Sequence, residues 1–168
     1  TPATSDGEMI SAKVSESDAT VSGGATLKLD TGARLDVVNK KTLTIAEIST
    51  LYIDTSVSDQ TQIFVESLSG LVIYGKLVVN ITEDILEDII YEFNLISFED
   101  DSRIAELGDF VKDENLFLTV NGEKFDGEWI YSIKENVVSI SVNVPEPATI
   151  AAIFGALALG LAVYRRRK

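Results

Sequence analysis

The chain has 168 residues, of which 27 are acidic and 14 are basic, and it contains neither histidine nor cysteine. Its formal net charge of −13 argues against binding to nucleic acid, which requires a basic surface. Without histidine or cysteine, the chain cannot form a Ser-His-Asp or Cys-His catalytic arrangement, a disulfide framework or an ordinary zinc site.

The first 15 residues carry no pattern that indicates a fold, and we treat residues 1–15 as an N-terminal fragment of unclear structure. The sequence begins with threonine rather than methionine. We therefore expect an N-terminal piece to be missing, either a cleaved signal peptide or a longer exported region.

An eight-residue period follows, and it is clearest between residues 24 and 55, which divide into GATLKLDT, GARLDVVN, KKTLTIAE and ISTLYIDT. Positions four and six of these octets are always apolar: Leu27 and Leu29, Leu35 and Val37, Leu43 and Ile45, Leu51 and Ile53. Weaker copies extend the pattern over residues 16–82: Ala19 and Val21, Ile63 and Val65, Leu71 and Ile73, Val79 and Ile81. Each octet reads as a short strand followed by a turn.

Two mainly β folds fit this period. Three octets could form one triangular coil of a β-solenoid, which would place Leu27 beneath Leu51. The alternative is a β-meander of short antiparallel strands. Because the octets lack the Asn-Gly and Asp-Gly turns of tight hairpins, we favour the solenoid.

Residues 83–143 predict an α+β cap on the end of the repeats. TEDILEDII has helical spacing of its aliphatic residues, with Thr82 as the N-cap, and DSRIAELGDF suggests one or two helical turns that end at Gly108. Three final strands follow as an antiparallel meander, with a hairpin at Asn121–Gly122. Trp129 lies in an alternating strand, so we expect it to pack in the core.

Acidic residues cluster at four places in this region: Glu83–Asp84, Glu87–Asp88, Glu99–Asp100–Asp101 and Asp113–Glu114. Such clusters could supply the paired carboxylates of a glycosidase or oxygen ligands for calcium. None has the spacing of a calcium loop, and we interpret them as a solvated acidic surface. We therefore predict no catalytic residue, no metal ligand and no cofactor.

Residues 144–168 differ from everything before them. The prolines keep Val144–Pro147 extended, and no charge interrupts residues 148–164. As a helix this run spans roughly 26 Å, so we expect one transmembrane helix. The four final cations, Arg165, Arg166, Arg167 and Lys168, would remain in the cytoplasm and leave the N-terminal region outside.

VPEPAT, an apolar helix and RRRK in this order resemble the PEP-CTERM sorting domain of exported bacterial proteins. The resemblance makes Pro145, Glu146 and Pro147 the sorting signal. It implies an exosortase-type membrane peptidase as a partner, with processing near these residues. Octets that lead into such a tail also resemble autotransporter-like β-solenoid surface proteins.

The sequence therefore predicts an exported bacterial cell-surface or extracellular-matrix protein that is not an enzyme and has a structural or adhesive role. Its precursor would cross the membrane once, and its mature form would lie at the cell surface or outside the cell. The membrane and extracellular polysaccharide are further expected partners. The alternative is an extracellular polysaccharide-active enzyme on a β-solenoid scaffold.

Overall fold

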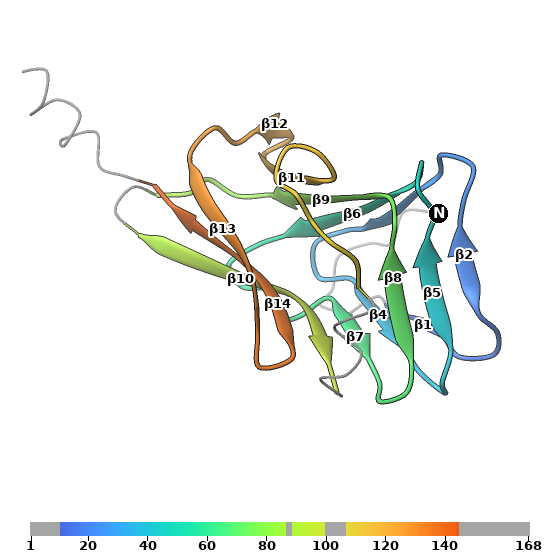
Figure 1. Cartoon of the computed structure of the whole chain (residues 1–168). Helices are drawn as coiled ribbons and strands as arrows, with labels where there is room; N and C mark the ends of the chain where they lie inside the picture. The colour runs from blue at the N-terminus through green and yellow to red at the C-terminus, as the bar shows by residue number, and fades with distance from the viewer. Residues whose placement is uncertain (1–10, 87–88, 100–106, 145–168) are drawn as a thin grey trace, which may run out of the picture.

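Figure 1 shows a computed structural model of the chain, which describes residues 11–86, 89–99 and 107–144. All regular secondary structure within these ranges is β-strand. The predicted mainly β class is therefore confirmed.

The strands form three sheets. The six-stranded sheet has the order β1 (Ser11–Val14), β4 (Arg34–Val37), β7 (Ile63–Val65), β10 (Ile90–Phe98), β14 (Val137–Asn143), β13 (Glu128–Lys134). The five-stranded sheet has the order β12 (Glu123–Lys124), β11 (Leu116–Val120), β9 (Lys76–Ile81), β6 (Thr50–Thr55), β3 (Thr26–Leu29). The three-stranded sheet has the order β2 (Ala19–Val21), β5 (Thr42–Ile45), β8 (Gly70–Ile73).

Consecutive strands from β1 to β9 pass through the three sheets in rotation, and each strand from β1 to β6 pairs in parallel with the strand one circuit later. Leu27 lies opposite Leu51, as a coil of 24 residues predicts. The antiparallel meander is therefore wrong for the octets. Regular structure also begins earlier than expected, because β1 lies within residues 1–15 and pairs with β4.

Four-residue turns explain how an octet changes sheet. The amide of Ala33 donates to the carbonyl of Asp30, and the amide of Lys41 donates to that of Val38. Each turn follows a four-residue strand, so strand and turn together make eight residues. Gly75 lies where the next circuit passes close to the turn between β5 and β6, because a Cβ there would overlap the carbonyl oxygens of Ala46 and Ser49.

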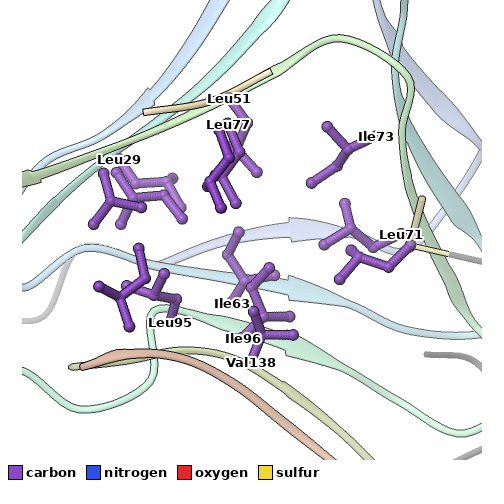
Figure 2. Close-up of a cluster of buried hydrophobic side chains, with 14 of the residues drawn as sticks. Leu29, Leu51, Ile63, Leu71, Ile73, Leu77, Leu95, Ile96 and Val138 are labelled. Atoms are coloured by element: carbon purple, nitrogen blue, oxygen red, sulfur yellow. The ribbon is translucent and has the colours of Figure 1, made fainter. Parts of the chain in front are cut away.

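The apolar octet positions fill the space enclosed by the three sheets. Figure 2 shows Leu51 and Leu77 pointing toward Ile63, and Leu71 and Ile73 approaching the same space from the three-stranded sheet. Stacked residues such as Leu51 and Leu77 are fully buried. The core therefore follows from the octet period.

Beyond β9 the sequence predictions hold only in part. The helix expected after Thr82 is wrong for residues 82–86 and 89–90, which contain no helix, and Ile90 begins β10. Instead, the amide of Leu86 donates to the hydroxyl of Tyr91, and Ile85 packs against the core in a non-helical segment. The predicted helical turns before Gly108 fall on residues 100–106, which lie outside the described residues.

The predicted three-stranded cap is also divided between two sheets. The Asn121–Gly122 hairpin is confirmed, with φ values of 51° and 83° that allow a tight turn. However, β11 pairs in parallel with β9, whereas β13 and β14 form their own hairpin in the six-stranded sheet. Trp129 is buried in β13, as predicted. The C-terminal residues therefore extend two existing sheets and do not form one separate meander.

Candidate functional site

The chain passes directly from a buried strand into the predicted sorting signal. Strand β14 pairs with β10 on one side and β13 on the other, and Val142 is fully buried. The following Val144 still packs against the core. Since Pro145 is the next residue, no free linker separates the folded domain from the signal.

The sorting residues themselves lie outside the described residues. This applies to Pro145, Glu146 and Pro147, to the apolar run 148–164, and to Arg165, Arg166, Arg167 and Lys168. The structure describes the surface of the folded domain at the point where this segment begins. In Figure 1 the end of β14 and the start of β10 lie together at the edge farthest from β2 and β5.

We call this exposed part of the six-stranded sheet the distal surface, and six residues form it in two rows. One row is Ile90, Asn143 and Glu128, and the next is Glu92, Ser141 and Ile130. All six alternate with buried or half-buried residues, so they share the outer face of the sheet. The face combines two exposed aliphatic side chains with two carboxylates around the strand that carries the signal.

An aromatic cluster supports the distal surface from the inner side of the same sheet. Phe110 contacts the ring of Tyr131 edge to face at 5.5 Å between centroids. The Nζ of Lys112 lies 4.5 Å from the centroid of the Trp129 ring. Burial raises the pKa of Tyr131 to about 12, because the phenolate is disfavoured away from water. These contacts hold β13, whose outer side chains Glu128 and Ile130 belong to the distal surface.

Of the acidic clusters singled out in the sequence, Glu87–Asp88 lies outside the described residues, and the other three have structural contacts. Glu83 accepts a hydrogen bond from the amide of Val57, and Asp84 accepts one from the side chain of Asn121. Asp113 forms an ion pair with Lys124 at 3.1 Å. Among the residues that the structure describes, no group of three or more acidic side chains could hold a metal ion. Of the Glu99 cluster only Glu99 is described, and it accepts from the amide of Ser67.

A polar column on the five-stranded sheet was not predicted. Register places Asp54 beside Asn80 and Asn80 beside Thr119. Asn80 donates to Asp54 Oδ1 at 2.6 Å and accepts from Thr119 Oγ1 and from the amide of Gly122, both at 2.8 Å. Asn80 and Asp54 are both buried, so these bonds hold the β11–β12 hairpin against the coil.

The column ends at Lys28, whose Nζ lies 2.7 Å from Asp54 and 2.9 Å from Asp30. Hydrogen bonds to these carboxylates, first to Asp54, raise the pKa of Lys28 above its ordinary value. One signal in the sequence could have indicated the column: Asp30 and Asp54 occupy the same octet position one circuit apart.

Comparison with known families identifies the segment that follows β14. Residues 143–168 match the PEP-CTERM protein-sorting motif. The match begins at Asn143, in the first row of the distal surface. PEP-CTERM motifs are recognised by exosortase, a membrane protein, and imply export and sorting to the cell surface. The predicted resemblance at the C-terminus is confirmed.

The comparisons support nothing further about the β-strand domain. No curated protein and no solved structure matches the chain. The resemblance to autotransporter-like surface proteins is therefore unsupported. Within residues 11–86, 89–99 and 107–144, no helix is long and apolar enough to cross a membrane, and the run 148–164 falls outside these ranges.

Proposed function

We propose that this chain is an exported bacterial surface or matrix protein with a structural or adhesive role and no catalytic activity. The observation that carries the proposal is the PEP-CTERM match at residues 143–168, directly after a buried strand. A rigid domain joined to a sorting signal without a linker is suited to display at a surface.

In the precursor, residues 148–164 span the membrane once as a helix. Arg165, Arg166, Arg167 and Lys168 remain in the cytoplasm, and the β-strand domain lies outside. Exosortase recognises Pro145, Glu146 and Pro147, and processing near them releases the domain or attaches it to the envelope.

The ectodomain acts as the end of a β-solenoid. The rotation of strands β1 to β9 through three sheets, with parallel pairing between successive circuits, supports this classification. Such stacks suit a structural role because each circuit buries the apolar face of the one before it. Extracellular polysaccharide is the ligand class that we assign to its outer faces.

Mass spectrometry of the mature protein from its host tests the proposal. We expect the mature form to lack Tyr164–Lys168. Replacement of Pro145, Glu146 and Pro147 by alanine should leave an unprocessed precursor in the membrane fraction. An intact C-terminus on the mature wild-type protein would mean that the segment is a permanent anchor.

A bound calcium ion would contradict the proposal that the domain works without a metal. A specific site occupied at a hundredfold excess over Kd would stabilise the domain by about 2.7 kcal/mol. Diffuse screening of the acidic surface would act equally with sodium. We therefore expect equal thermal midpoints in calcium and in sodium of matched ionic strength, and a rise with calcium alone would contradict the proposal.

A further inference from the structure

The distal surface lies within reach of whatever binds the Pro-Glu-Pro element. Pro145 is two residues beyond Asn143, so their Cα atoms are separated by about 7 Å at most. Val144 is held against the core and cannot lengthen this tether. An enzyme that holds the element in a cleft must therefore approach the end of the six-stranded sheet.

The side chains at this end suit a protein partner. Ile90 is 72% exposed and Ile130 is 68% exposed, and register places them diagonally across β14. The strands that carry them, β10 and β13, lie on either side of β14 and are therefore about 10 Å apart. Two exposed aliphatic groups on one face, with a polar border, give a protein partner an apolar contact inside a polar rim.

The charge on this border distinguishes between two possible partners, a protein and the membrane surface. Glu92 and Glu128 lie on the same face as the two isoleucines, and both are exposed. Carboxylates at these positions would be repelled by an anionic bilayer and attracted by a partner with cationic groups around an apolar centre. The charge pattern therefore favours a protein over the lipid surface.

We propose that the distal surface is a docking site for the membrane peptidase that recognises the Pro-Glu-Pro element. The inference rests on the proposed function and adds to it a second point of recognition, on the folded domain. The partner meets Ile90 and Ile130 with apolar side chains and meets Glu92 and Glu128 with cationic ones. Recognition then requires a folded ectodomain as well as the linear motif.

The test measures how fast the full-length precursor is processed in host cells by pulse-chase. We expect Ile90→Ser combined with Ile130→Ser to slow processing roughly tenfold, because exposed apolar anchors dominate such contacts. Ile48→Ser is the matched control, since Ile48 is 74% exposed on a turn between β5 and β6. It should be processed at the wild-type rate. Equal rates for the double variant and the control would overturn the inference.

Charge reversal separates the peptidase from the bilayer. Glu92→Lys with Glu128→Lys should slow processing if the partner is cationic at this border. Unchanged or faster processing would overturn the proposal, and faster processing would indicate docking on anionic lipid. If alanine replacement of Pro145–Pro147 does not stop processing, the proposed function itself fails. If only that replacement has an effect, the motif is sufficient and the docking site is wrong.

Discussion

Leu43 provides the most direct test of the octet core. Its side chain is 2% exposed and stacks between Ala19 and Leu71. Leu43→Ala removes three carbons, which corresponds to about 2.4 kcal/mol of lost burial at roughly 0.8 kcal/mol per carbon. Ala19 is small and only half-buried, so the cavity opens toward the edge of the coil and can relax. We therefore expect a loss of about 2–3 kcal/mol.

Leu71→Ala should cost more, about 3–5 kcal/mol, because Leu71 is fully buried one circuit further from that edge. Thr44 points outward on the same strand as Leu43, so Thr44→Lys should stay within about 0.5 kcal/mol of wild type. Urea unfolding can be followed by the emission of Trp129, the single tryptophan, which is buried in the native domain. Equal losses for Leu43→Ala and Thr44→Lys would refute the structural role of the period. A larger loss at Leu43 than at Leu71 would refute the reasoning about cavity relaxation.

Three further changes test other parts of the fold. Asn80→Asp sets a second buried carboxylate against Asp54 and should cost about 3 kcal/mol or more at pH 7 in urea unfolding. A loss below about 1 kcal/mol, as for an exposed charge, would contradict the burial of this pair. The buried Tyr131 hydroxyl has no hydrogen-bond partner among the described residues, and its pKa rises from 10.0 to about 12 on folding. The contribution of the neutral hydroxyl to the stability of the domain is therefore fully present below pH 10 and is lost between pH 10 and 12. Tyr131→Phe should match wild type at pH 7 within about 1 kcal/mol and resist alkaline unfolding better, and identical alkaline unfolding curves would count against the assignment. Gly75→Ala forces a backbone overlap and should cost about 2–4 kcal/mol in urea unfolding. Gly23→Ala introduces only the strain of a positive φ and should cost about 1 kcal/mol. A larger loss for Gly23→Ala than for Gly75→Ala would contradict the close contact of Gly75 with the Ala46 and Ser49 carbonyls.

The core of the coil could be predicted from sequence because its signal is local and repeated. Each octet carries its own apolar pair and its own turn, so Leu27, Leu51 and their equivalents are identified without knowledge of distant contacts. The hairpin at Asn121–Gly122 is equally local, since its two positive φ angles favour these residues. The Pro-Glu-Pro element was found because it lies beside an apolar run and a basic tail.

The predictions that failed depended on long-range pairing. The aliphatic spacing after Thr82 fits a helix, but so short a helix is stable only if tertiary packing supports it. The structure instead packs Ile85 on the core and uses the amide of Leu86 to bind Tyr91. The sheet that β11 joins depends on β9, about 40 positions earlier in the chain, and no local pattern encodes this choice.

The polar column shows the same limit at the level of side chains. Asp54 and Asn80 occupy outward positions, where the alternation predicts exposure. They are buried because Lys28 of the neighbouring strand β3 and the β11–β12 hairpin of the same sheet contact them. The alternation of residues along one strand gives no information about contacts that distant segments of the chain make with it.

The position of β14 has a mechanical consequence for a protein held at its C-terminus. Tension applied through Val144 pulls along β14, which is hydrogen-bonded over its whole length to β10 and β13. Ladder bonds in an antiparallel pair lie across the strand, so this pull shears many of them together and does not open them one after another. Resistance to force is set by the rate of unfolding under load. Flow or traction at the cell surface would therefore act first on a strand that is hydrogen-bonded on both sides.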